Sequence, residues 1–125
     1  MKKIKILLID DEIEFTSTLA ERLELRGFEV STADNGVSGV ELTRNAFFDI
    51  AIVDLMMPGI SGLETLTQIK TFNAKLPVIL LTGHGSTKEG MEGMRIGAVD
   101  YLMKPLDIND LLAKIKEILK DFDNR

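Results

Sequence analysis

The chain has 125 residues, of which 45% are hydrophobic and none is cysteine, and its formal net charge is −5. A chain of this length builds one core, so we expect a single domain over residues 1–125, with its core at about residues 3–120. Without cysteine there is neither a disulfide framework nor a thiolate zinc site, and the acidic balance argues against direct nucleic-acid binding, which needs clustered Lys and Arg.

Membrane and export signals are also absent from the pattern. The apolar runs have about six residues, far fewer than the roughly 20 of a membrane-spanning helix. The N-terminus places basic residues before apolar ones, as a signal peptide does, but the acidic residues from Asp10 to Glu14 interrupt that pattern. We therefore expect a cytoplasmic protein that does not contact a membrane.

The predicted elements alternate between strands and helices. Nearly continuous apolar runs indicate strands buried on both faces, and apolar residues at helical spacing indicate helices between them. In chain order we expect a strand at 4–9, a helix at about 12–26, a strand at 29–33, a helix after Asn35–Gly36, a strand at 49–54, a helix at 61–72, a strand at 77–81, a helix near 87–95, a strand at 100–103 and a helix at 107–121.

Local signals support several of the helix ends. Gly27 follows the first helix as a C-cap. Ser61 with Glu64 three residues later is typical of a capping box at the start of the third helix. The fourth helix has the weakest signal, because four glycines lie in or beside it.

This alternation predicts an α/β fold, a doubly wound (βα)5 flavodoxin-like sandwich with a five-stranded parallel sheet. Ligands of such sheets bind outside the carboxyl ends of the strands. Five polar residues fall at those ends, namely Asp10, Asp11, Asp54, Thr82 and Lys104. The fold class therefore predicts one polar site at one edge of the sheet.

Carboxylates that lie close together repel one another and take up protons unless a cation compensates them. Mg²⁺ prefers oxygen ligands, and the Lys104 ammonium adds a second positive charge. A carboxylate beside Mg²⁺ can attack a phosphoryl group and form an aspartyl phosphate, and Asp54 at the end of the central strand is the best nucleophile. The Thr82 hydroxyl, the Lys104 ammonium and the Gly83 amide are candidates to bind the phosphoryl oxygens.

With these residues in place, the chain resembles a response-regulator receiver domain of the two-component signalling family. The resemblance runs from about Lys3 to Leu119 and implies the strand order 2-1-3-4-5. The segments that carry it are Ile9–Asp10–Asp11–Glu12, Val53–Asp54–Leu55–Met56–Met57–Pro58–Gly59, Leu81–Thr82–Gly83 and Gly97–Ala98–Val99–Asp100–Tyr101–Leu102–Met103–Lys104–Pro105.

The resemblance implies a phosphoryl donor and a metal. A sensor histidine kinase or a phosphotransfer protein would donate from a phosphohistidine to Asp54. Asp11, Asp54 and the backbone carbonyl of Met56 would bind Mg²⁺, with Asp10 acting through water. The chain would be a signalling switch with intrinsic phosphotransfer and autodephosphorylation chemistry, not a metabolic enzyme.

The resemblance also implies how the signal leaves the site. Thr82 and Tyr101 would form a switch pair that reshapes the surface of the fourth helix, fifth strand and fifth helix for a downstream effector protein or a fused output domain. Lys104–Pro105 is typically a cis peptide in the family. Met56 and His84 occupy the positions that tune the loss of phosphate, and Met56 cannot hydrogen-bond an attacking water, so we expect slow self-dephosphorylation.

Other interpretations stay open on the sequence. A Mg²⁺-dependent aspartyl phosphatase would carry a second carboxylate at the position of Met56. A flavodoxin-like electron carrier would need a first loop that attracts the flavin phosphate, whereas Asp10, Asp11 and Glu12 would repel it. A degenerate receiver that serves only as an interaction module would lack the acidic set that is complete here. Read alone, the three acidic residues at 10–12 could also simply favour the N-terminus of the first helix.

Overall fold

The structure is a computed structural model that describes residues 2–83 and 87–120. Strands and helices alternate along these ranges. The strands are β1 (Lys5–Ile9), β2 (Glu29–Ala33), β3 (Ile50–Asp54), β4 (Val78–Thr82) and β5 (Asp100–Met103). The helices are α1 (Ile13–Leu25), α2 (Gly36–Asn45), α3 (Gly62–Phe72), α4 (Thr87–Ile96) and α5 (Ile108–Ile118).

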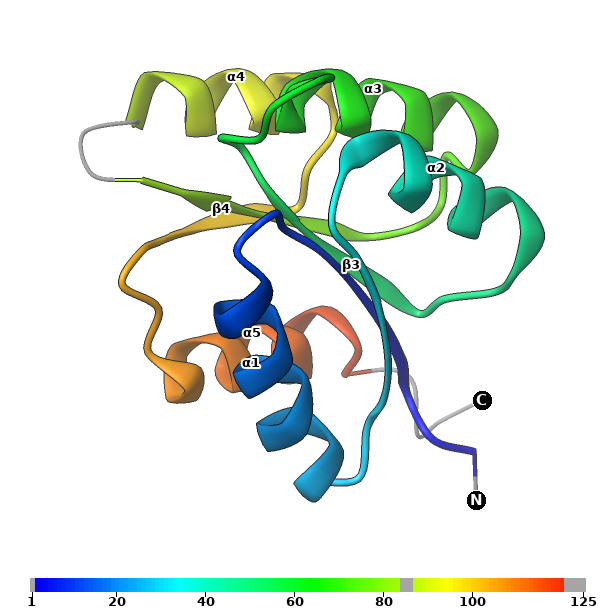
Figure 1. Cartoon of the computed structure of the whole chain (residues 1–125), viewed down its shortest axis with the longest axis vertical. Coiled ribbons are helices and arrows are strands. Elements are labelled where there is room, and N and C mark those ends of the chain that lie inside the picture. The colour runs from blue at the N-terminus through cyan, green and yellow to red at the C-terminus, as the bar shows by residue number, and fades with distance from the viewer. Residues whose placement is uncertain (1, 84–86, 121–125) are drawn as a thin grey trace.

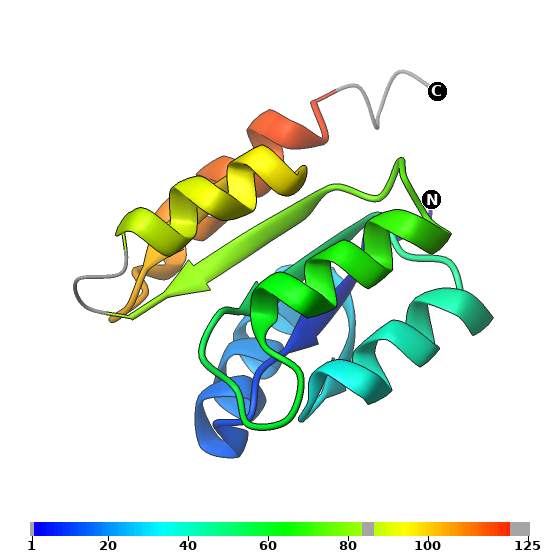
Figure 2. The same ribbon diagram turned by 90° about the horizontal axis from the view of Figure 1, so that it is seen from above.

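The strands form one parallel sheet in the order β2-β1-β3-β4-β5, which confirms the predicted fold class and strand order. Helices α2, α3 and α4 cover one face of the sheet, and α1 and α5 cover the other (Figure 1). Viewed from above, the helices run along the strands on both sides of the sheet (Figure 2). The molecule is therefore a three-layer sandwich.

Continuous apolar strands explain the two cores of this sandwich. Every residue of β3 and β4 is buried, as expected for central strands of a parallel sheet with helices on both faces. Alternate strand residues point to opposite faces, so Leu7, Val53 and Leu80 pack toward α2, α3 and α4. Ile6, Ile52 and their neighbours pack toward α1 and α5.

The element ends agree with the predicted ones to within a few residues. Glu12 is the N-cap of α1 rather than its first helical residue. The Ser61 hydroxyl accepts the Glu64 N–H at 3.1 Å, as the capping box predicts, and Gly27 has the positive φ of a C-cap glycine. Helix α5 ends at Ile118, because Leu119 leaves helical geometry, whereas the prediction extended it to Asp121, which lies outside the described residues.

The pairing register brings the carboxyl ends of four strands to one edge. Asp54, the last residue of β3, pairs with Leu81 of β4, and Thr82, the last residue of β4, pairs with Met103 of β5. Asp10 follows β1, and Lys104 follows β5 and begins the cis Lys104–Pro105 peptide that the resemblance implies. The side chains predicted to form the site therefore do lie at one edge of the sheet.

Helix α3 packs closely beneath this edge. A Cβ atom on Gly62, the first residue of α3, would lie 2.3 Å from the carbonyl oxygen of Asp54 and 2.5 Å from Cα of Leu55. The backbone of the loop that follows β3 can lie this close only because residue 62 has no side chain.

Among the helices in the described ranges, none combines the length and apolarity that crossing a bilayer requires.

Candidate functional site

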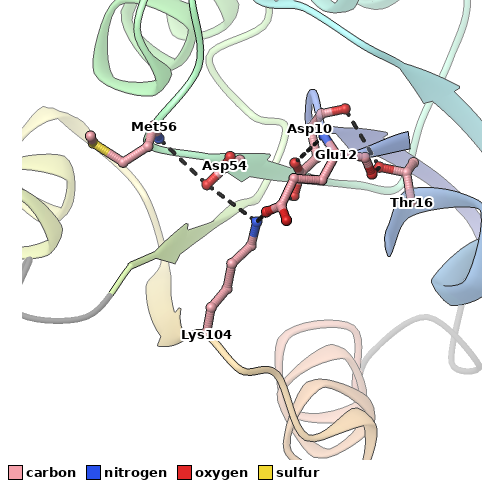
Figure 3. A network of polar contacts seen from close by, with 6 residues as sticks. All are labelled: Asp10, Glu12, Thr16, Asp54, Met56 and Lys104. Atoms are coloured by element: carbon pink, nitrogen blue, oxygen red, sulfur yellow. Dashed lines mark hydrogen bonds and ion pairs between the residues drawn. The ribbon is translucent and has the colours of Figure 1, made fainter. Parts of the chain in front are cut away.

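Two carboxylates are buried at the carboxyl edge of the sheet. Asp10 and Asp54 are each only 3% exposed. One oxygen of Asp10 accepts the backbone N–H of Glu12 at 3.0 Å, and one oxygen of Asp54 accepts that of Met56 at 3.4 Å. The close-up in Figure 3 shows both carboxylates pointing into the space that the Lys104 side chain reaches.

Lys104 connects the acidic residues of three segments. Its ammonium lies 2.9 Å from Oδ2 of Asp10, 2.5 Å from Oε1 of Glu12 and 3.7 Å from Oδ1 of Asp54. The same nitrogen lies 4.7 Å from the centroid of the Phe15 ring, within the range of a cation–π contact. The lysine is therefore bound most closely by the residues around α1 and lies farther from Asp54.

Burial changes the protonation equilibria of this site. Desolvation, followed by the charge of Asp10, raises the pKa of Asp54 to about 6, against the lowering effects of Lys104 and the Met56 N–H. Burial alone would lower the pKa of Lys104, but its hydrogen bonds to Glu12 and Asp10 outweigh that effect, and its pKa is raised. At neutral pH the lysine stays charged and Asp54 is largely ionised. Burial nevertheless destabilises this ionised form of Asp54.

The site suits a hard cation. Asp10, Glu12 and Asp54 each offer a carboxylate oxygen, and these oxygens lie within 4.8 Å of one another. Oxygen ligands of this kind match the preference of Mg²⁺, and one lysine cannot neutralise three carboxylates. An acidic cluster able to hold a metal ion is therefore a property of this structure.

The grouping differs in one residue from the predicted set of Asp10, Asp11, Asp54 and the Met56 carbonyl. Glu12 belongs to the group of close carboxylates, and Asp11 does not. Asp11 is half-buried and near enough that its charge contributes to the raised pKa of Asp54. The roles of Asp11 and of the Met56 carbonyl as ligands stay predictions.

Thr82 is the buried polar residue of the neighbouring strand end. Its side chain is fully buried, and within residues 2–83 and 87–120 its hydroxyl has no hydrogen-bond partner. Its carbonyl accepts the backbone N–H of Lys104 at 2.8 Å, which connects the end of β4 to the residue that follows β5. Gly83 is half-buried next to it, and His84 lies outside the described residues.

Glu12 is the residue that the sequence analysis missed as a member of the site. The predicted set of site residues does not include Glu12, yet its side chain reaches Lys104, 92 residues away in the sequence. The available signal was its place directly after Asp10 and Asp11. That signal does not tell where a side chain points, since the partner lies on another element.

Comparison with known proteins identifies one family. The model of the family described as "Response regulator receiver domain" matches residues 6–116. The transcriptional regulatory protein CpxR homolog of Haemophilus influenzae is 40% identical over 116 residues, which are 93% of this chain and 50% of that protein. The transcriptional regulatory protein ZraR of Klebsiella oxytoca is 37% identical over 94% of this chain and 27% of its own length. The chain thus spans about a quarter to a half of the curated relatives it matches.

Solved structures agree with this match. The response regulator receiver domain protein (CheY-like) from Methanospirillum hungatei has a TM-score of 0.92 and 31% identity, with 98% of both chains covered. A response regulator receiver domain protein from Clostridium thermocellum has a TM-score of 0.89 and 36% identity, with 96% of this chain and 97% of that chain covered. Fold and sequence comparisons therefore point to the same family.

Proposed function

Because the chain belongs to the response regulator receiver family of two-component systems, we propose that it is a phosphorylation-activated switch whose phosphoacceptor is Asp54. One observation carries this proposal. The carboxylate of Asp54 is buried at the end of the central strand, with the ammonium of Lys104 at 3.7 Å. The Thr82 hydroxyl, which no described residue hydrogen-bonds, lies on the adjoining strand end. A nucleophile, a cation and a hydroxyl donor at one edge suit phosphoryl transfer, which depends on positioning and charge neutralisation.

In the proposed reaction, an ionised oxygen of Asp54 attacks the phosphorus of a phosphohistidine. The bond between phosphorus and the imidazole nitrogen breaks, its electron pair stays on that nitrogen, and an acyl phosphate remains on Asp54. The sensor histidine kinase or phosphotransfer protein regains a histidine. Because the pKa of Asp54 is about 6, the nucleophile is mostly in its reactive, ionised form at neutral pH.

The surrounding residues would stabilise the product. Mg²⁺, held by Asp10, Asp54 and either Glu12 or Asp11, would supply positive charge next to the phosphoryl oxygens. Lys104 would neutralise one phosphoryl oxygen, which requires its ammonium to exchange a close carboxylate for the phosphoryl group. The Thr82 hydroxyl and the Gly83 amide would donate hydrogen bonds to the others.

A surface on α4, β5 and α5 would transmit the signal. Thr82 moves toward the phosphoryl group in this proposal, and Tyr101 moves with it. Large apolar side chains are exposed on and between α4 and β5, and they offer contact area to a downstream effector protein or a fused output domain: Met91, Met94, Val99 and Met103. Direct nucleic-acid binding by this domain is not expected, since its net charge is −5.

Family membership supports the switch over the phosphatase and the electron carrier left open by the sequence. A degenerate receiver belongs to the same family, so only a phosphorylation experiment distinguishes it from an active receiver. The test is incubation with acetyl phosphate and Mg²⁺, followed by intact-mass measurement. We expect wild-type protein to gain one phosphoryl group and Asp54→Asn to gain none.

Asp49→Asn is a matched control, because Asp49 is also a buried aspartate but binds the Lys5 backbone N–H at 2.8 Å, away from the site. We expect this variant to gain mass as wild type does. An unaltered wild-type mass, or a full gain in Asp54→Asn, would overturn the assignment.

A further inference from the structure

Helix α4 meets the sheet through two glycines. A Cβ atom on Gly90 would lie 2.8 Å from Cγ and Cδ2 and 2.9 Å from Cε2 of Tyr101. A Cβ atom on Gly93, one turn further on, would lie 2.0 Å from Cδ1 of Leu80. These separations are too short for real atoms, so the Tyr101 ring lies directly against the backbone of α4.

Both glycines are costly for a helix of ten residues. Glycine is the poorest helix former after proline, because it has the most backbone freedom to lose. Close packing accounts for Gly93, which brings α4 down onto β4. Gly90 instead faces an aromatic side chain that is only half-buried, and its effect is to let that one ring approach the helix.

We propose that Gly90 is a positioning residue of the switch. Because it has no side chain, it leaves a space on α4 that the Tyr101 ring occupies in the unphosphorylated protein, and we call this space the seat. The inference rests on the proposed function, in which Thr82 and Tyr101 move together. It adds that α4, through Gly90, sets the resting position of the ring. The response to phosphorylation then depends on residue 90 as well as on Thr82.

The geometry of the sheet connects the seat to the site. Tyr101 pairs with Leu80 across β4 and β5, and its side chain packs with Leu80 in the core beneath α2, α3 and α4. Thr82 lies two residues after Leu80 and therefore faces the same side of the sheet. The ring, the seat and the buried threonine are thus on one face, the one that α4 covers.

A methyl group at residue 90 leaves the ring few ways to adjust. The Cγ atom of Tyr101 is only two bonds from the β5 backbone, so it moves mainly by rotation about χ1 between staggered positions. Gly90→Ala therefore either drives the ring off its seat or lifts α4 from the sheet. Both results change the surroundings of Tyr101 before any phosphoryl group is present.

A thermal double-mutant cycle tests the contact itself. Gly90→Ala is expected to lower the melting temperature when Tyr101 is present. In a Tyr101→Ala background the same change is expected to raise it by about 4 °C, because alanine is the better helix former. Gly93→Ala is the matched control, since it meets Leu80 and should lower the melting temperature in both backgrounds. A Gly90→Ala effect of the same sign in both backgrounds would show that there is no seat.

Tyrosine fluorescence tests the link to switching. The chain has one tyrosine and no tryptophan, so its emission reports Tyr101 alone. With beryllofluoride and Mg²⁺, the emission intensity of wild type should change. The intensity of Gly90→Ala should differ from that of wild type before the addition and should change less after it. Identical emission of the two proteins in both states would refute the inference.

The two proposals fail in different ways. If acetyl phosphate labels Asp54 but wild-type tyrosine emission is the same with and without beryllofluoride, the seat has no role in switching, and the phosphoacceptor assignment stands. If no label appears on Asp54, the proposed function is wrong.

Discussion

Replacement of Asp54 by asparagine is predicted to stabilise the fold when divalent cations are removed. Desolvation and the charge of Asp10 raise the pKa of Asp54 from 3.8 to about 6. A carboxyl group with a raised pKa favours folding fully below its unfolded-state pKa, and that contribution is lost as pH rises through the folded-state value. This rise in the pKa of Asp54 corresponds to about 3 kcal/mol of destabilisation once Asp54 is ionised.

Asp54→Asn keeps the shape of the side chain and removes its charge. In the presence of a chelator, its free energy of unfolding should exceed that of wild type by up to about 3 kcal/mol near pH 8, and the difference should vanish below about pH 4. Urea denaturation across this range measures it. The attraction of Lys104 for ionised Asp54 lowers this pKa, so the value of about 6 already includes the ion pair that the substitution removes.

The control is again Asp49→Asn, which weakens a charge-assisted hydrogen bond to Lys5 and should destabilise the protein by about 1–2 kcal/mol. Opposite signs for the two buried Asp→Asn changes would show that desolvation and the charge of Asp10 destabilise the ionised form of Asp54. Should Asp54→Asn be no more stable than wild type near pH 8, or keep the same advantage at acidic pH, the electrostatic account of the site is wrong.

Four further predictions concern the site and its support. Mg²⁺ at 100 times its Kd should stabilise wild type by about 2.7 kcal/mol, seen as a higher melting temperature, and Asp10→Asn should lose most of this gain. Thr82→Val should raise the free energy of unfolding by about 1–2 kcal/mol, because it removes a buried hydroxyl without a partner in the described residues; a decrease in urea denaturation would argue against this. Gly62→Ala should cost about 1–3 kcal/mol, because its methyl group would press on the Asp54 carbonyl; a neutral effect would show that α3 can shift. Met56→Asn should accelerate decay of phosphorylated protein, measured by intact mass over time, and unchanged decay would contradict a role for residue 56 in positioning water.

The strand ends were predictable because a parallel sheet has simple rules. Continuous apolar runs located the buried strands, and the polar residues at their ends had to lie at one edge once the strands were parallel. Asp10, Asp54 and Lys104 meet there as expected, with the lysine in contact with both carboxylates. Helix ends differ from the predicted ones by at most three residues, since helix termini depend on weak local preferences.

The apolar pattern along the chain was enough to predict which elements form, which of their faces are buried and which polar residues reach the carboxyl edge of the sheet. Side-chain contacts between distant elements had to come from the folded chain: Glu12 rather than Asp11 contacts Lys104, and the Tyr101 ring lies against Gly90. The spacing of apolar residues shows on which face of an element a residue lies, because burial of the apolar face drives folding. The atoms that a side chain meets belong to an element distant in sequence, and their positions follow from the packing of the whole domain.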